Sequence, residues 1–313
     1  MAAGLAGCGF LGIALETVSG TYTAPTKYIY IRSESLTYMQ ETVWRRPIGQ
    51  TVDVTAAIPG NAHVEGDVEF EVTPDSAVFF HHIMRGALNK TGAGPYTYVY
   101  TGNCGATGVN TASAKTASIT VVRNGIVFAY TGCLVSQVQY SVDNGTLIGT
   151  YSIVGNDEAV QSAPTPTWPT TVPFGAGDIA LQVPTATPIF DTEGFELTIN
   201  DNAEPQFRMK NTGRGAQFVK FGERDVTMSV ERDFDSRTDY DAFKALTAQS
   251  ITWAATKGAE TMTFLMAAAT KNTYEVGLNG QGDLVRASIE YQAVRAASGN
   301  AYQMTIITTE NIT

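Results

Sequence analysis

Histidine side chains are the first groups in this sequence that could bind a metal or move a proton, but their spacing argues against both. His81 and His82 are adjacent on a predicted helix, where neighbouring side chains diverge by about 100°, so they cannot share one metal as i, i+4 histidines do. His63 stands alone. We therefore predict surface or half-buried structural roles for all three histidines.

The cysteines and glycines give no recognisable reaction centre either. Cys8, Cys104 and Cys133 lie far apart without a CxxC pair, which favours neither a metal site nor a disulfide framework and indicates a reducing compartment. Gly280-Gln281-Gly282 lacks the third glycine of a dinucleotide-binding motif and joins two predicted strands. Walker A and GxSxG motifs are absent from the sequence. We expect no cofactor and no enzymatic activity.

Two acidic clusters remain as candidate calcium ligands. Their members are Glu65, Asp67, Glu69 and Glu71 in the first cluster and Asp233, Asp235, Asp239 and Asp241 in the second. On a strand, the i, i+2, i+4 spacing of the first cluster lines one face and does not surround an ion, and the second lacks a twelve-residue calcium loop. A solvated acidic face is the favoured interpretation of both.

Composition places these residues on a strand-rich protein. The 313 residues include only 16 % charged side chains and carry a net charge of −10. Abundant Gly, Thr, Ser, Val and Tyr favour an all-β fold with minor α. The acidic balance opposes a tight grip on nucleic-acid phosphates. No apolar run is long enough to cross a bilayer, so we expect no integral membrane protein.

A strand followed by a helix occurs twice, which indicates an internal duplication. Residues 67–72 alternate apolar and polar side chains, and a helical pattern follows through Phe79, Phe80, Ile83 and Met84. Residues 225–230 repeat this pattern before Tyr240, Phe243 and Leu246. We expect Asp75 or Ser76 to accept hydrogen bonds at the start of the first helix. Thr238 with Asp241 resembles a capping box at the start of the second.

Turn and loop signals divide the rest of the chain. Asn124-Gly125 and Asn144-Gly145 predict two β-hairpins, over 118–130 and 138–154. Segments 41–65 and 200–222 are too long for ordinary loops inside a compact domain, so we predict an arm at the equivalent place in each repeat.

Prolines mark the boundary between the halves. Pro164, Pro166, Pro169 and Pro173 surround Trp168, a density that favours a semi-rigid extended linker. The predicted organisation is an extended or loosely packed N-terminal arm over 1–26, a first β-sandwich domain over 27–160, a linker over 161–177 and a second β-sandwich domain over 178–313.

Three stretches resemble a known family. They are Leu11-Gly12-Ile13-Ala14-Leu15-Glu16-Thr17 continuing through Gly20-Thr21 and 24–36, His63-Val64-Glu65-Gly66-Asp67-Val68-Glu69-Phe70, and Tyr274-Glu275-Val276-Gly277 through Arg286-Ala287-Ser288. Together they resemble the major tail tube proteins of long-tailed, siphovirus-type bacteriophages, over nearly the whole chain.

The resemblance implies two tandem β-sandwich or partial-barrel tail-tube domains, each with one flanking helix and a long loop that contacts the next ring. Six such domains form a ring around a DNA channel, and rings stack into the tail through which the genome is ejected. With two repeats per chain, three chains would complete a pseudo-hexameric ring, although a hexamer with the second half as outer decoration stays open.

The same resemblance implies a virion tail location after assembly in the host cytoplasm. Its implied partners are a tape measure protein, a tail terminator, distal tail proteins and double-stranded DNA that passes without adhering.

Two sets of residues are candidates for these functions. Aromatic and Arg residues are enriched in interface hot spots. We therefore predict ring-to-ring contacts for Trp44, Arg45, Arg46, Phe207, Arg208 and Lys210. If Glu65, Asp67, Glu69 or Glu71 faces the channel, repulsion of phosphates would keep DNA from adhering. The alternative is a carbohydrate-binding or adhesin-type β-sandwich module of a phage or bacterial surface, which would need an exposed aromatic platform or export.

Overall fold

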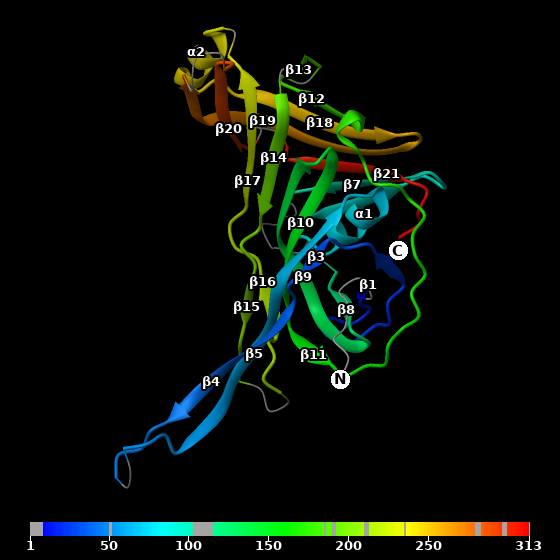
Figure 1. Ribbon diagram of the computed structural model, residues 1–313, viewed down its shortest axis with the longest axis vertical. Helices are drawn as coiled ribbons and strands as arrows, with labels where there is room; N and C mark the ends of the chain where they lie inside the picture. The colour runs from blue at the N-terminus through cyan, green and yellow to red at the C-terminus, as the bar shows by residue number, and fades with distance from the viewer. Residues whose placement is uncertain are drawn as a thin grey trace.

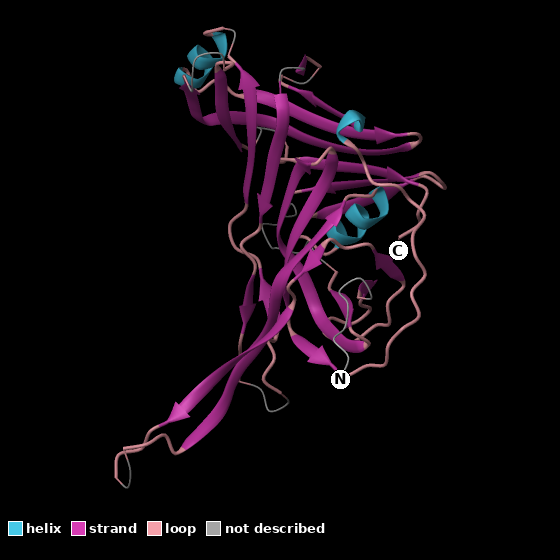
Figure 2. Ribbon diagram, in the orientation of Figure 1, coloured by secondary structure: helices cyan, strands magenta, loops and turns pink. Residues whose placement is uncertain are grey.

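One antiparallel sheet runs through both halves of the chain. The computed structural model describes residues 9–49, 52–102, 115–184, 186–189, 192–209, 213–234, 236–278, 283–295 and 299–312. Strands make up most of this described chain (Figure 2). Eight of them pair, always antiparallel, in the order β4 (Thr37–Arg45), β5 (Ala56–Glu71), β10 (Thr146–Gly155), β9 (Ile126–Asp143), β14 (Thr192–Asn200), β17 (Asp225–Asp233), β20 (Arg286–Ala293) and β19 (Glu260–Gly277). We call these eight strands the front sheet.

A second layer lies behind the front sheet, and its strands cross the front strands in Figure 1. Behind the first half it contains β2 (Lys27–Ile29), β1 (Phe10–Leu15), β8 (Ala117–Arg123), the first part of β9 and β11 (Asp157–Ala159). Behind the second half it contains β13 (Pro188–Ile189), β12 (Ile179–Gln182), β18 (Gln249–Lys257), the first part of β19, β21 (Gln303–Thr308), β7 (Tyr96–Thr101) and β6 (Ala87–Thr91). Thus β9 and β19 each belong to both layers.

Four short elements complete the described fold. They are β3 (Ser33–Glu34), which pairs with β5, the two-stranded sheet of β15 (Glu204–Gln206) and β16 (Phe218–Lys220), and a 3-10 helix over Ala176–Asp178. The prediction of an all-β fold with minor α is confirmed.

The two halves repeat one topology but share a core. Strands β4-β5-β10-β9 of the first half correspond in order to β14-β17-β20-β19 of the second. Pairing crosses the halves at β9–β14 and at β7–β21. Buried apolar residues of both halves form one cluster, in which the rings of Tyr140 and Trp253 lie 5.9 Å apart. The two halves therefore pack around one shared core. The division into two tandem domains stays a prediction.

A buried ion pair fastens the seam between the halves. The Arg224 guanidinium donates to Asp201, which is fully buried, and to the backbone carbonyl of Arg85. Arg85 in turn donates to the carbonyl of Gly222 at 2.6 Å. Residues on both sides of the seam are therefore held by charge-assisted hydrogen bonds.

The two helices differ in burial although both lie behind the front sheet. Helix α1 (Pro74–His82) is buried along its length, and Phe80 packs between Phe70 and Tyr151 with ring centroids 5.0 and 4.5 Å away. Helix α2 (Thr238–Lys244) has no fully buried residue and covers β19 through Tyr240 and Phe243 against Tyr274. Helix α1 packs against β21 and β19 of the back layer, whereas α2 contacts β19.

Ser76 accepts a hydrogen bond at the start of α1 as predicted, whereas the capping box predicted for α2 is not formed. Thr73 caps α1 by accepting from the Ser76 amide at 3.3 Å, and Ser76 accepts from the Thr73 amide at 3.1 Å. Asp75 instead accepts from Thr171 at 2.8 Å and Thr308 at 2.7 Å, because it faces the linker and β21. Thr238 is the first residue of α2, whose N-cap Arg237 makes no side-chain capping bond.

Both predicted Asn-Gly hairpins are confirmed. Asn124 and Gly125 have φ of 50° and 77°, and Asn144 and Gly145 have φ of 48° and 78°. Two consecutive positive φ values are what a two-residue type I′ turn requires. The turns join β8 to β9 and β9 to β10, so β9 is the shared strand of both hairpins.

Two segments pack more tightly than the sequence suggested. Within the predicted N-terminal arm, β1 pairs with β8 and buries Leu11 and Ile13 completely, because its apolar residues fill the back layer. The linker is extended (Figure 1), yet Phe174 is fully buried and Trp168 stacks on Tyr30 at 4.6 Å.

His81 and His82 are buried, which corrects their predicted surface or half-buried position. The His81 Nε2 atom lies 2.8 Å from the Tyr140 hydroxyl, and the His82 Nδ1 atom lies 2.8 Å from the Tyr100 hydroxyl. The two rings have separate partners and do not converge. Burial lowers the pKa of His81 to about 3, and the neighbouring His82 acts in the same direction.

Candidate functional site

The four acidic residues singled out in the sequence form one row on β5. Alternation along the strand turns them away from the core. The exposed or half-exposed members are Glu65, Asp67, Glu69 and Glu71, and the buried residues between them include Val68 and Phe70. The Ser152 hydroxyl donates to Asp67 at 2.6 Å, and Arg32 lies 3.6 Å from Glu69. The row is thus partly hydrogen-bonded and accessible to solvent.

The register carries this polar face across the whole front sheet. Starting at Glu69, successive neighbours are Thr150, Gln139, Thr198, Thr227, Gln292 and Thr270. Starting at Glu71, they are Ile148, Ser141, Glu196, Ser229, Glu290 and Thr273. Both rows cross from the first half to the second at β9–β14. We call this surface the polar face.

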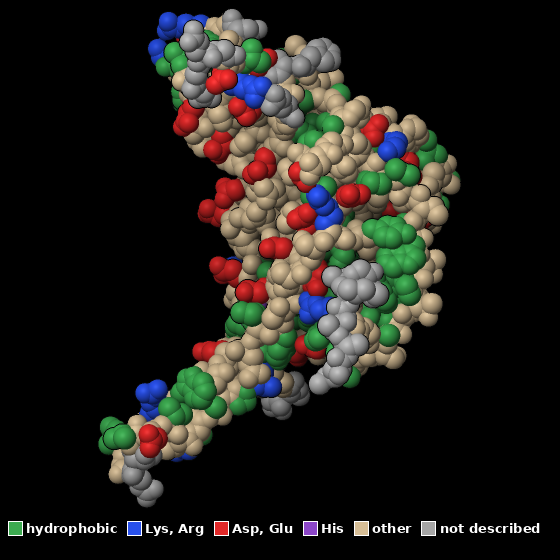
Figure 3. Space-filling model, in the orientation of Figure 1, with side chains coloured by type: hydrophobic (Ala, Val, Ile, Leu, Met, Phe, Trp, Pro, Cys, Tyr) green, Lys and Arg blue, Asp and Glu red, His purple; other side chains and the backbone are tan. Residues whose placement is uncertain are grey.

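Sequence reasoning did not assign to the polar face the acidic residues that the second half adds, although it named Asp233 in the second acidic cluster. By strand alternation they are Glu196, Asp225, Glu231, Asp233, Glu275 and Glu290. Arg286 lies among them, 3.9 Å from Glu231 and 3.7 Å from Asp233. Figure 3 shows Asp and Glu side chains gathered along the hollowed left edge of the molecule. The alternation of residues 225–230, continued to the end of β17, was the signal that could have identified Asp225, Glu231 and Asp233.

The first predicted arm is a β-hairpin that extends far from the body (Figure 1). It is formed by β4 and the first part of β5, with Trp44 opposite Ala57 and Arg45 opposite Ala56. Trp44 is 60 % exposed, and Ile48, near the turn, is fully exposed. Arg46 is exposed directly after β4. Such apolar side chains on a projecting hairpin are typical of an interaction surface.

The second predicted arm does not project in the same way. Its strands β15 and β16 pair, and the Ala62 amide donates to the Arg214 carbonyl at 3.1 Å, which fastens this segment to the base of the first arm. Phe207 packs edge-on against His63 with centroids 6.0 Å apart, and Arg208 lies over Phe218. Lys210 lies outside the described residues. Phe207 and Arg208 are therefore not grouped with Trp44, Arg45 and Arg46.

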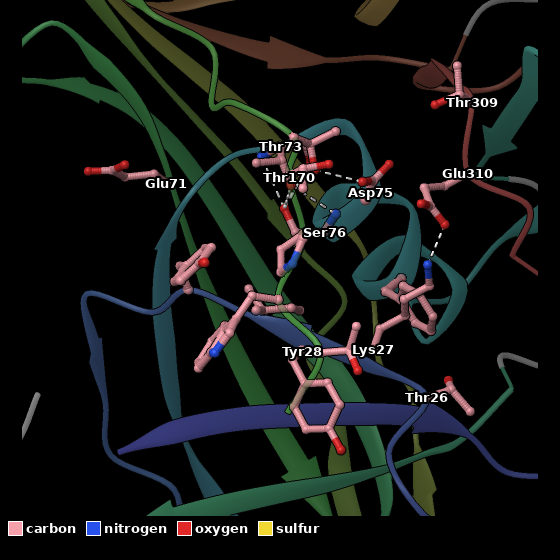
Figure 4. A pocket seen from close by; sticks show the side chains of 17 residues that line it. Thr26, Lys27, Tyr28, Glu71, Thr73, Asp75, Ser76, Thr170, Thr309 and Glu310 are labelled. Atoms are coloured by element: carbon pink, nitrogen blue, oxygen red, sulfur yellow. Dashed lines mark hydrogen bonds and ion pairs between the residues drawn. The ribbon is translucent and has the colours of Figure 1, made fainter. Parts of the chain in front are cut away.

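A cavity of about 280 Å³ lies behind the front sheet, between β2, the start of α1, the linker and the C-terminal segment (Figure 4). Lys27 makes an ion pair with Glu310 across it. Asp75 holds Thr171 and Thr308, and burial raises the pKa of its carboxyl. These contacts join distant segments of the chain.

The remaining chemical groups form no further site in the described chain. Cys133 is buried, which raises the pKa of its thiol, while Cys8 and Cys104 lie outside the described residues. No three His, Cys, Asp or Glu side chains of the described ranges are grouped as metal ligands would be. None of the helices in those ranges has the length and apolarity to span a membrane.

Comparison with protein families identifies a match over most of the chain. A family model described as phage tail tube protein matches residues 9–293. That span covers the front sheet, both arms and every strand of the back layer except β21. Among the curated proteins, none matches the chain.

Proposed function

The chain belongs to the phage tail tube protein family, and from that premise we propose that its polar face lines the channel through which DNA passes. Membership makes it a structural protein of the virion tail that assembles with its own copies into a tube. The observation that carries the proposal is the continuous polar face across both repeats, whose charged residues in the two rows are all acidic.

Strand number favours three chains per ring over six. With strands about 4.8 Å apart and tilted by about 35–45°, three chains of eight front strands form a 24-stranded barrel roughly 45–50 Å across between backbones. Six chains, with 48 strands, would form a barrel roughly 90–100 Å across between backbones. A barrel of the eight strands of one chain would have an interior filled by side chains. A 24-stranded wall leaves room for one DNA duplex. We therefore propose a trimeric, pseudo-hexameric ring.

The chemistry of the polar face suits a channel that must not retain DNA. Phosphates bind proteins chiefly through Lys and Arg, whose contacts release counterions. Apart from Ile148, the rows from Glu69 and Glu71 contain hydroxyl, amide and carboxylate groups, and they contain no basic residue. Repulsion acts within a Debye length of about 8–10 Å, so DNA near the wall meets no attractive site along these rows.

The projecting hairpin is our candidate for contact between stacked rings. It presents Trp44 and Arg45 beyond the edge of the sheet, where a second ring can bury them. The tape measure protein, tail terminator and distal tail proteins are further partners that the family implies. Assembly in the host cytoplasm and genome ejection through the tube belong to the same proposal.

Electron microscopy tests the proposed trimeric ring, and DNA retention tests the proposed channel wall. Negative-stain images of the concentrated protein should show threefold rings or stacked tubes. Monomers that bind glycans would favour the alternative carbohydrate-binding module, and sixfold rings would contradict the barrel estimate.

Charge reversal then tests the polar face. Tubes of Glu196→Lys/Glu290→Lys should retain a short DNA duplex on sedimentation in a salt-sensitive way. The matched control Asp241→Lys/Glu204→Lys reverses two exposed charges outside the front sheet and should retain no more than the unmodified protein. Equal retention by both variants would overturn the assignment of the channel wall.

A further inference from the structure

Both edges of the front sheet lack a strand partner within the described chain. At one edge β3 and β4 pair only with β5. At the other, the segment of β19 from Thr270 to Gly277 pairs only with β20. A cavity of about 750 Å³ runs beside the first edge and is bounded by Tyr30, Ser33, Arg123 and Trp168, among others. Open edges of this kind readily pair with another chain.

Within one chain, the two repeats already meet by pairing two such edges, β9 of the first repeat and β14 of the second. β14 pairs with β17 in the same register as β3 pairs with β5. Thr198 lies opposite Thr227, and Ser33 lies opposite Glu69. These two pairs are equivalent, since residues 67–72 of β5 correspond to 225–230 of β17 in the duplication. β3 and β4 pair with successive parts of β5 and form one edge, so β14 and this β3–β4 edge are the matching first edges of the two repeats.

The last strands of the two repeats also match in register. Gln139 of β9 faces Thr150 in the first repeat, and Thr270 of β19 faces Gln292 in the second. Thr150 and Gln292 are equivalent because they lie opposite Glu69 and Thr227. Inside the chain, β9 and β14 meet with Gln139 opposite Thr198. This joint is a template for the contact between chains.

We propose that β19 of one copy pairs antiparallel with β3 of the next copy, with Thr270 opposite Ser33. The inference rests on the proposed function and adds the register of the joint between subunits. Strand direction fits, because the eight front strands alternate and the first and last run oppositely. Chemistry fits as well: Thr270 and Ser33 both belong to the row through Glu69, so the joint closes that row around the channel with polar groups.

A disulfide between copies tests the register. The variant Ser33→Cys/Thr270→Cys, in a Cys8→Ser/Cys104→Ser background that keeps buried Cys133, places cysteines on directly opposed residues, within the Cα separation that a disulfide tolerates. Oxidised tubes should give covalent dimers and trimers on non-reducing gels. The matched control Ser33→Cys/Glu275→Cys moves one cysteine along the same edge, roughly 13–17 Å away at about 3.4 Å per residue, and should give none.

The outcomes of this experiment distinguish a wrong register between β19 and β3 from a wrong proposed function. Tubes that assemble without the Ser33–Thr270 crosslink, or that crosslink equally in the control, would overturn the register while leaving the tail tube function intact. Failure of the unmodified protein to form rings or tubes would instead count against the proposed function.

Hydrogen exchange on the unmodified protein gives a second measurement should the cysteine variant not assemble. Amides in 31–35 and 270–277 should exchange at least tenfold more slowly in tubes than in free chains. Unchanged exchange in assembled tubes would overturn the joint.

Discussion

Buried neutral His81 should make the unassembled protein sensitive to acid, and replacing it should remove a measurable part of that sensitivity. Burial lowers the pKa of His81 to about 3 in the folded chain, whereas an unfolded histidine has a pKa of about 6.5. Between these values the unfolded state binds a proton that the folded state does not. Stability therefore falls as the pH falls through 6.5, by up to about 1.4 kcal/mol per pH unit.

The magnitude follows from the two pKa values. Between pH 7 and pH 4.5, His81 alone should lower the free energy of unfolding by about 2.5 kcal/mol. His81→Gln keeps a polar group beside the Tyr140 hydroxyl but does not titrate in this range, so it should lose about 2.5 kcal/mol less than the unmodified protein over the same interval. Its stability at pH 7 should be lower, because the contact between His81 Nε2 and Tyr140 is altered.

Urea unfolding of the unassembled protein at pH 7 and pH 4.5 measures both quantities. His63→Gln is the matched control, since His63 lies beside Glu65 near the surface and its replacement leaves His81 buried. The control keeps His81, so it should retain the loss of about 2.5 kcal/mol that His81 contributes between pH 7 and pH 4.5. If His81→Gln also loses as much as the unmodified protein, His81 is not the neutral buried group described above.

Three further predictions concern the seam, the arms and a turn. Arg224→Met leaves Asp201 buried without its cation and should lower the free energy of unfolding in urea by about 3–5 kcal/mol; Asp201→Asn/Arg224→Met should recover part of that loss, and a double variant no more stable than Arg224→Met would contradict the ion pair's role. Trp44→Ala/Phe207→Ala should leave the circular dichroism of the subunit unchanged but abolish tubes in electron micrographs, whereas normal tubes would refute the assignment of the arms. Gly145→Ala should cost about 1 kcal/mol or slightly more in thermal unfolding, because φ is +78° there while no atom lies within 4 Å of the added Cβ; an unchanged melting temperature would argue against the type I′ turn.

Local patterns in the sequence were sufficient for the clearly alternating strands, the two hairpins and the acidic row. Asn144-Gly145 specifies its turn through two backbone conformations, and alternation in 67–72 specifies which side chains share a face. These properties depend on residues a few positions apart, so they are legible without the rest of the chain. The unusual length of 41–65 also revealed an arm, although not that it is a two-stranded hairpin.

Long-range pairing decided the rest. The sequence by itself determined that the chain is strand-rich, duplicated and acidic on one strand face. Only the tertiary structure decided that β9 pairs with β14, that both halves share one core and that the polar face is continuous. It also decided that His81 is buried and that the second arm packs on the base of the first. The physical reason is that strand edges can pair with many partners, and the choice among them depends on which pairing buries the most apolar surface across residues far apart in the chain.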